Sequence, residues 1–226
     1  MGRPFHFAPS TPVMRYFLFD LDGTLIDSAP SILKSFAAIL KDAGIEPVVP
    51  LESNLIGPPL LQTLERISGV QDSVHLVALA DAFKAYYDRT GYQETVVYPG
   101  VAESLAQLDR LGARLYIVTN KRIAPTRLIL DYFGWTRWFD GVYAQDAFVP
   151  ALPSKAAVIK AVLDHHAINA DEAVYIGDRQ EDGEAAKVNR LRFIWAQWGY
   201  STEIDPSLCR EGDVISCPAQ LLDSFT

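Results

Sequence analysis

Short runs of apolar, β-branched or aromatic residues recur along the chain, and turn-forming residues bound most of them. Runs of this kind predict buried β-strands. After residue 99 the runs alternate with segments of helical periodicity, which predicts a parallel sheet with helices on both faces. The predicted strands are Tyr16–Phe19, Arg114–Thr119, Val142–Ala144, Ala173–Ile176, Arg192–Ala196 and Asp213–Ser216, and the predicted helices are Val101–Leu111, Ala124–Phe133, Lys155–His166 and Asp182–Asn189.

Residues 29–95 differ from the rest, because they show helical periods and almost no strand pattern. Ser28 suits a helix N-cap, and an apolar stripe follows it as far as Gly44. Two further helices are predicted over Leu60–Ser68 and Ser73–Arg89. A helical insertion directly after the first strand should lie over the carboxyl end of that strand, where open α/β sheets bind ligands, and act as a lid.

The pattern therefore predicts an α/β fold in two domains. A discontinuous core of 14–28 and 96–226 would form a Rossmann-like sheet with helices on both faces, and 29–95 would form a small all-helical cap domain. Residues 1–13 match no structural period and are expected to be an N-terminal extension.

Composition narrows the class of protein. The 226 residues are 49% hydrophobic, which is typical of a globular protein. The net charge of −8 comes without a Lys/Arg-rich run, so a nucleic-acid partner is not expected. The sequence has no apolar stretch of membrane-spanning length and no secretory signal pattern, and Cys209 and Cys217 suit reduced thiols. We therefore expect a cytoplasmic protein without a membrane partner, either a monomer or a homodimer.

The strongest chemical pattern is Asp20-Leu-Asp22-Gly23-Thr24, which directly follows the first predicted strand. Alternation along an extended chain sends the side chains of Asp20 and Asp22 in the same direction, so both can face one site. A solvated turn is the alternative, since Asp, Gly and Thr are common turn residues. A calcium-binding EF-hand loop does not fit, because its glycine stands at position six.

Three weaker patterns follow later strands or open helices. The strand Arg114–Thr119 ends in Thr119-Asn120, which taken alone suits a helix cap equally well. Lys155 opens a helical segment, although most lysines in such positions are solvated. A further apolar strand runs into Gly177-Asp178 and is followed by Asp182, a spacing that suits a cation site or, alternatively, helix capping.

These four patterns, in this order, resemble the haloacid dehalogenase superfamily of phosphohydrolases, and the resemblance extends from Tyr16 to about Phe225. Many relatives carry a Lys-Pro pair in the third motif, whereas Lys155 here precedes Ala156 and matches a variant of that motif. The segments Gly57–Leu60, Tyr98–Val101 and Trp198–Tyr200 are similar to the phosphoglycolate phosphatase-like branch, which has a helical cap.

The resemblance implies an aspartyl-phosphate mechanism that depends on Mg²⁺. It assigns the nucleophile to Asp20, the general acid and base to Asp22, and the grip on the phosphoryl oxygens to Thr119 and Lys155. Mg²⁺ would be held by the carboxylates of Asp20 and Asp178 and the main-chain carbonyl of Asp22, with Asp182 orienting Lys155 or a coordinated water. The substrate-binding residues would be Gly23, Thr24, Asn120 and Lys121.

Several alternatives stay open at the level of sequence. A phosphomutase on the same scaffold would carry the same catalytic residues, and a non-catalytic phosphate-binding protein would retain the fold. The substrate is expected to be a small phosphorylated metabolite, with phosphoglycolate, a nucleoside monophosphate, a sugar phosphate and pyrophosphate all compatible. Lys121, Arg122 and Arg179 flank the expected site and could supply charge to it, although solvated surface is the ordinary role for each of them. Trp195, Trp198 and Tyr200 suit packing or an interface patch better than a substrate stack.

Overall fold

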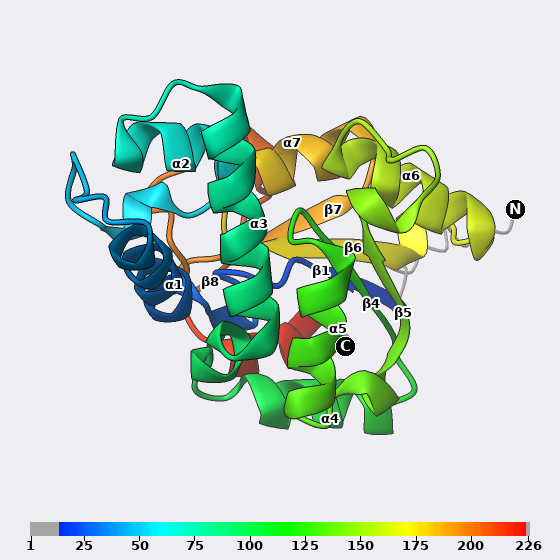
Figure 1. The fold of residues 1–226 in the computed structure, drawn as a ribbon. Helices are drawn as coiled ribbons and strands as arrows, with labels where there is room; N and C mark the ends of the chain where they lie inside the picture. The colour runs from blue at the N-terminus through cyan, green and yellow to red at the C-terminus, as the bar shows by residue number, and fades with distance from the viewer. Residues whose placement is uncertain (1–13, 225–226) are drawn as a thin grey trace, which may run out of the picture.

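A six-stranded parallel sheet lies at the centre of the molecule, shown by a computed structural model that describes residues 14–224 (Figure 1). Every neighbouring pair of its strands is parallel, which confirms the predicted α/β class. In spatial order the strands are β5 (Phe139–Ala144), β4 (Arg114–Thr119), β1 (Tyr16–Phe19), β6 (Ala173–Gly177), β7 (Arg192–Ala196) and β8 (Val214–Ile215).

Alternating side chains of the central strands enter two different cores. In β1, Phe17 and Phe19 face one layer, whereas Leu18 faces the other. The first layer is covered by α4 (Val101–Arg110) and α5 (Ile123–Tyr132), and the second by α6 (Lys155–His165) and α7 (Gln180–Val188). Because both faces are buried, the strands consist of nearly continuous apolar runs, which is why the sequence pattern located them.

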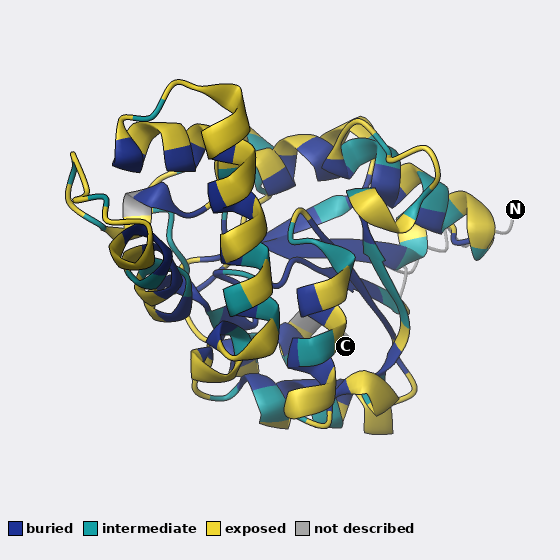
Figure 2. Ribbon diagram, in the orientation of Figure 1, coloured by how far each residue is buried: buried dark blue, intermediate teal, exposed yellow. Residues whose placement is uncertain are grey.

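Three helices between β1 and β4 pack around a separate apolar cluster. They are α1 (Ala29–Asp42), α2 (Leu60–Ser68) and α3 (Ser73–Arg89), and together they form what we call the helical insert. Phe36 of α1 stacks on Phe83 of α3 with ring centroids 4.6 Å apart. Figure 1 places these helices together at one side of the sheet, and Figure 2 shows that they alternate between buried inner positions and exposed outer ones.

Two short linker strands join the sheet to the helical insert, and the sequence pattern did not reveal them. They are β2 (Ile26–Asp27) and β3 (Val96–Val97), which pair antiparallel. A strand of two residues has no measurable hydrophobic period, and these two become strands only through their pairing across about 70 residues of chain. We refer to them as the first and second linker.

Other boundaries differ by a few residues from the predicted ones. Strand β5 begins at Phe139 rather than Val142, and helix α7 begins at Gln180 rather than Asp182. Asp182 therefore lies inside the first turn of α7, where its carboxylate accepts a hydrogen bond from the main-chain N–H of Arg179. The predicted N-terminal extension, 1–13, lies outside the described residues.

Across residues 14–224, none of the helices combines the length and apolar character needed to cross a lipid bilayer. Cys209 and Cys217 are both unpaired, in agreement with the expected reduced thiols.

We expect Leu64→Ala to lower the free energy of unfolding by about 2–5 kcal/mol, because the side chain is fully buried in the core of the helical insert. The matched control is Leu61→Ala on the same helix, where the leucine is 46% exposed and the expected change is within about 0.5 kcal/mol. Urea unfolding followed by circular dichroism measures both. Equal effects of the two substitutions would contradict a separate core in the insert.

Candidate active site

The carboxyl ends of three adjacent strands bring the predicted polar residues together. Asp20 follows β1, Thr119 ends β4 and Asp178 follows β6, and β1 lies between the other two strands. The main-chain N–H of Asp20 donates to the carbonyl of Ile176 at 2.9 Å, which extends the pairing of β1 with β6 as far as the site. Parallel order thus turns three distant sequence patterns into one cluster.

Three buried carboxylates form the centre of this cluster. One oxygen from each of Asp20, Asp178 and Asp182 lies within 4.8 Å of the others. The Oδ1 atoms of Asp20 and Asp178 are buried and make no hydrogen bond within the described structure. Converging buried carboxylate oxygens of this kind suit a hard divalent cation such as Mg²⁺, which prefers oxygen ligands. The donor set therefore fits the metal that the sequence pattern predicted.

Two glycines leave the space that Asp178 occupies. A Cβ atom on Gly23, which has φ +83°, would lie 2.5 Å from Asp178 Oδ2. A Cβ atom on Gly199 would lie 2.2 Å from the Cβ of Asp178. Both contacts are shorter than side chains tolerate, so Gly23 and Gly199 let the loops close around the carboxylate.

Burial raises the pKa of both central carboxyl groups. The pKa of Asp20 rises to about 6, mainly through loss of hydration, although Lys155 partly opposes the rise. The pKa of Asp178 rises to about 7, again mainly through burial and then through the charges of Asp20 and Asp182. A cation at this cluster would reverse that balance, because it favours the charged form of each carboxylate.

Lys155 supplies the positive charge that the structure places inside the cluster. Its Nζ atom lies 3.3 Å from Asp20 Oδ1 and donates a short hydrogen bond to Asp182. Burial by itself would lower the pKa of Lys155, but Asp182 and Asp20 outweigh it and raise the pKa well above its usual value. The side chain is held at the start of α6, where Ser154 caps the helix by accepting from the N–H of Ala157.

Asp22 forms an ion pair with Lys121, and its carboxylate is not one of the three that form the cluster. Lys121 Nζ lies 3.1 and 3.2 Å from the two carboxylate oxygens of Asp22. It also stands 4.7 Å from the ring centre of Tyr87, on α3 of the helical insert. The Lys121 side chain is 7% exposed, so the prediction that it is a solvated surface residue was wrong.

The remaining predicted residues lie around this centre. The Thr119 hydroxyl hydrogen-bonds the side chain of Asp20 and lowers its pKa, opposing the effect of burial. Thr24 is fully buried and its hydroxyl has no partner within the described structure. Asn120 is exposed, and its side-chain oxygen accepts from Gln145 at 3.1 Å, so this amide lies at the rim of the cluster.

Trp195, in β7, and Trp198, after it, pack against the two cores as predicted, and together with Tyr200 they also contact the site loops. Trp195 Nε1 donates to the carbonyl of Asp178 at 3.1 Å, and Trp198 Nε1 donates to the carbonyl of Thr24 at 2.9 Å. The main-chain N–H of Tyr200 donates to Asp178 Oδ2 at 2.8 Å. The sequence signal was their position just after a strand that neighbours the site, but the hydrogen bonds depend on tertiary structure.

Two arginines reach from the sheet core to the helical insert, so their assignment to solvated surface was also wrong. Arg122 makes two hydrogen bonds, of 2.6 and 3.0 Å, to the carboxylate of Asp88 on α3. Arg179 donates to the carbonyl of Ile56 at 2.8 Å, in the segment before α2. These contacts hold the insert beside the carboxylate cluster from two sides.

The fold and the residues of the site agree with a match to one known protein family. The sequence profile of the haloacid dehalogenase-like hydrolase family matches residues 17–196, and the chain belongs to this family. The resemblance inferred from the four motifs is thereby confirmed.

Known proteins support the assignment to the phosphoglycolate phosphatase-like branch. Phosphoglycolate phosphatase of Aquifex aeolicus is 31% identical over 207 residues, covering 89% of this chain and 95% of that protein. A structure described as a predicted phosphoglycolate phosphatase from Haemophilus somnus has the same fold, with a TM-score of 0.83 at 23% identity, covering 94% of this chain and 98% of that one.

Tyrosine-protein kinase PtkA of Mycobacterium tuberculosis is also similar, at 32% identity over 184 residues. The match covers 81% of this chain and 62% of PtkA, so the chain spans less than two thirds of that relative's length.

We expect the metal-free protein to lose stability as the pH rises from about 4 to about 7. Asp20 and Asp178 have folded-state pKa values of about 6 and about 7, above their ordinary value of 3.8. In that interval the folded chain binds more protons than the unfolded chain, so stability falls as the two groups ionise. Thermal unfolding in EDTA, measured across this range, tests the expectation.

The stabilisation by Mg²⁺ should grow as the pH rises, because Mg²⁺ binds the ionised carboxylates. The increase in Tm on adding Mg²⁺ should be larger at pH 7.5 than at pH 5. Asp178→Asn should remove most of this increase, whereas Asp164→Asn, in an exposed pair with Lys160, should retain it. An equal Mg²⁺ effect at both pH values would contradict a metal site at the buried carboxylates.

Proposed function

We propose that this protein is a Mg²⁺-dependent phosphatase that hydrolyses a small phosphate monoester through an aspartyl-phosphate on Asp20. The observation that carries the proposal is the buried cluster of Asp20, Asp178 and Asp182 with Lys155 in contact. A nucleophilic carboxylate beside a cation site is what phosphoryl transfer requires, since the phosphoryl oxygens need positive charge and the nucleophile needs a fixed position.

In the first step a carboxylate oxygen of Asp20 attacks phosphorus, and the bond from phosphorus to the leaving oxygen breaks. Asp22 protonates the leaving alkoxide, so the product alcohol departs neutral. Lys155 and the Thr119 hydroxyl are adjacent to Asp20 and are suited to hold the phosphoryl oxygens. One displacement from a poor leaving group is thereby replaced by two easier ones.

In the second step water attacks the phosphorus of the aspartyl-phosphate. The Asp22 carboxylate accepts the proton of that water, inorganic phosphate leaves, and the Asp20 carboxylate is regenerated. The net reaction consumes one water and one phosphate monoester and yields one alcohol and one phosphate. Asp22 therefore ends protonated, as it began, and is ready for the next cycle.

Asp20 and Asp178, together with the main-chain carbonyl of Asp22, are the residues proposed to hold Mg²⁺. A cation bound there supplies charge neutralisation for the phosphoryl oxygens. Asp182 accepts hydrogen bonds from Lys155 and from the N–H of Arg179, which favours a role in orienting Lys155 over direct coordination.

Lys121 suits recognition of an anionic leaving group, which narrows the proposed substrate class. It is buried between Asp22 and the ring of Tyr87, at the boundary of the helical insert. In the described state Lys121 is paired with both carboxylate oxygens of Asp22, the residue proposed as the acid of the first step. A substrate with a second negative charge, such as the carboxylate of phosphoglycolate, would compete for Lys121 and release Asp22.

A phosphomutase remains the alternative, because the residues around Asp20 would be the same. The kinase named among the relatives also has this type of fold, and a shared fold does not fix the acceptor of the phosphoryl group. The three outcomes differ in product, since only hydrolysis releases inorganic phosphate without an added acceptor.

The test is release of inorganic phosphate from a panel of monoesters with and without Mg²⁺. The panel holds phosphoglycolate, nucleoside monophosphates and sugar phosphates, and pyrophosphate is added to it. We expect Asp20→Asn to lower kcat by at least about 10³-fold, because the amide is a poor nucleophile. Asp164→Asn, at an exposed site, is the matched control and should retain wild-type activity.

Phosphate release that is unchanged in Asp20→Asn would refute the aspartyl-phosphate mechanism. Absence of release by wild type, together with phosphoryl transfer to an added sugar phosphate or to tyrosine, would favour the mutase or the kinase reaction.

Lys121→Met tests the substrate class. It should raise KM for phosphoglycolate at least about tenfold, but change KM for the uncharged leaving group of p-nitrophenyl phosphate much less. Lys160→Met replaces a lysine that is 70% exposed and should change neither KM. An equal effect of Lys121→Met on both substrates would contradict recognition of an anionic leaving group.

A further inference from the structure

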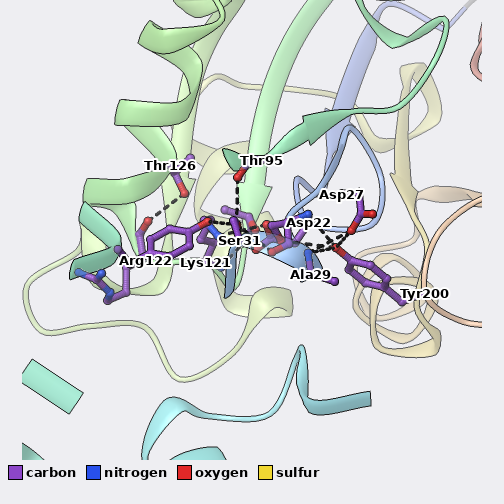
Figure 3. Close-up of polar contacts among 12 residues, drawn as sticks. Asp22, Asp27, Ala29, Ser31, Thr95, Lys121, Arg122, Thr126 and Tyr200 are labelled. Carbon is purple, nitrogen blue, oxygen red and sulfur yellow. Dashed lines mark hydrogen bonds and ion pairs between the residues drawn. The ribbon is translucent and has the colours of Figure 1, made fainter. Parts of the chain in front are cut away.

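Tyr200 joins the carboxylate cluster to the first linker, with its main chain at the cluster and its side chain at the linker. Its main-chain N–H donates to Asp178 Oδ2 at 2.8 Å. At the other end of the residue, the hydroxyl donates to Asp27 Oδ1 at 3.0 Å. Figure 3 shows this hydroxyl directed at the segment from Asp27 to Ala29, where the sheet core passes into the helical insert. One residue thus contacts both the proposed metal site and the start of the insert.

The same hydroxyl serves as a distant cap for helix α1. It accepts from the main-chain N–H groups of Ser28 at 2.9 Å and Ala29 at 3.1 Å. Helix starts leave such amides without partners inside the helix, and a local Ser or Asp side chain usually satisfies them. Here the Ser28 side chain makes no capping bond, and Asp27 Oδ1 accepts from the N–H of Ala29 at 3.0 Å. The Tyr200 hydroxyl, 172 residues beyond Ser28, is the additional acceptor. The orientation of α1 is therefore linked to the loop after β7.

The two linkers move together because they are bonded to each other. Ile26 and Asp27 of the first linker pair with Val97 and Val96 of the second. The Ser31 hydroxyl, in the first turn of α1, donates to the carbonyl of Ser28 at 2.9 Å and lies 3.3 Å from the Thr95 hydroxyl. A constraint on the first linker is consequently transmitted to the second.

Arg179 adds a contact between the same loops and the insert. Its guanidinium stands 5.4 Å from the ring centre of Tyr200, and Nη2 donates to the carbonyl of Ile56 at 2.8 Å. The next residue in the insert, Gly57, has φ +114°, and a Cβ atom there would lie 3.1 Å from Arg179 Cζ. The ring of Tyr200 therefore packs against the arginine that is hydrogen-bonded to Ile56 of the insert.

From these contacts we propose that Tyr200 is a positioning residue that holds the helical insert in its closed orientation over the carboxylate cluster through its hydroxyl. The proposal rests on the proposed function in one respect, that closure of the insert serves catalysis. Its geometric part stands on the structure alone: the hydroxyl is bonded to the first linker, and the first linker is paired with the second. Hinge residues that control such closure change kcat and KM together, although they do not touch the substrate.

Tyr200→Phe removes the hydroxyl and keeps the ring beneath Arg179. With the best monoester of the panel, kcat/KM should fall about tenfold, through changes in both constants. The Mg²⁺ concentration for half-maximal activity should stay within about twofold of wild type, because the main-chain N–H still meets Asp178. Tyr143→Phe removes a hydroxyl bonded to His166 at 2.7 Å, away from both linkers, and should leave all these constants unchanged.

A double-mutant cycle with Asp27→Ala tests whether the hydroxyl acts through the linker. Both substitutions remove the contact between Tyr200 and Asp27, and Asp27→Ala also removes the bond from Asp27 to the N–H of Ala29. The double variant should therefore lose no more than about twofold beyond the worse single variant. Fully additive losses, or a rise in the Mg²⁺ requirement equal to the loss in kcat/KM, would overturn the proposal.

Hydrogen–deuterium exchange gives a readout that needs no activity. In Tyr200→Phe, the amides of both linkers and of the residues next to them, 26–29 and 95–97, should exchange faster than in wild type and in Tyr143→Phe. Faster exchange confined to Ser28 and Ala29, or no change, would overturn the proposal. Wild type that releases no phosphate while the exchange result holds would refute the proposed function and leave the hinge role of Tyr200 supported.

Discussion

The structure depends on placing three carboxylates within a few ångströms of one another in a region that water barely reaches. Asp20, Asp178 and Asp182 repel one another and lose hydration, and Lys155 offsets only part of the charge. The two apolar layers around the sheet supply the stability that this arrangement costs. The surrounding loops contain glycines because the carboxylates fill the adjacent space. A Cβ atom on Gly177 would lie 2.5 Å from Asp182.

Cations and a tyrosine join the helical insert to the sheet core near this charge cluster. Lys121 meets Tyr87, Arg122 meets Asp88, and Arg179 meets the carbonyl of Ile56. Polar contacts of this kind are weaker in net free energy than apolar burial, so they can break and re-form during a catalytic cycle. The insert has its own apolar core, and the two paired linkers connect it to the sheet, which is the arrangement that motion of the insert as a unit would require. Its chemistry and its motion would then be controlled by the same few residues.

The relatives carry different names on one scaffold, and the structure suggests why. In the proposed mechanism the residues around Asp20 serve transfer of a phosphoryl group to a carboxylate, a step that a phosphatase and a mutase share. The next acceptor would then depend on the boundary between sheet and insert, where Lys121, Tyr87 and Arg179 lie. This boundary combines side chains from segments on both sides of the linkers, so small changes in the insert can alter specificity without disturbing the cluster.

The sequence by itself determined the sheet, the order of helices and the residues of the cluster. Buried parallel strands are continuous apolar runs, and the positions just after them, at Asp20, Thr119 and Asp178, face one edge. Tertiary structure alone decided how the cations pair: Lys121 with Asp22, Arg122 with Asp88, and Arg179 with Ile56. It also decided that the two linkers pair as strands. The contacts of Tyr200 likewise come from tertiary structure, since they join residues more than 170 positions apart. Local periodicity carries no information about such pairs, because each partner has an ordinary environment until the chain folds.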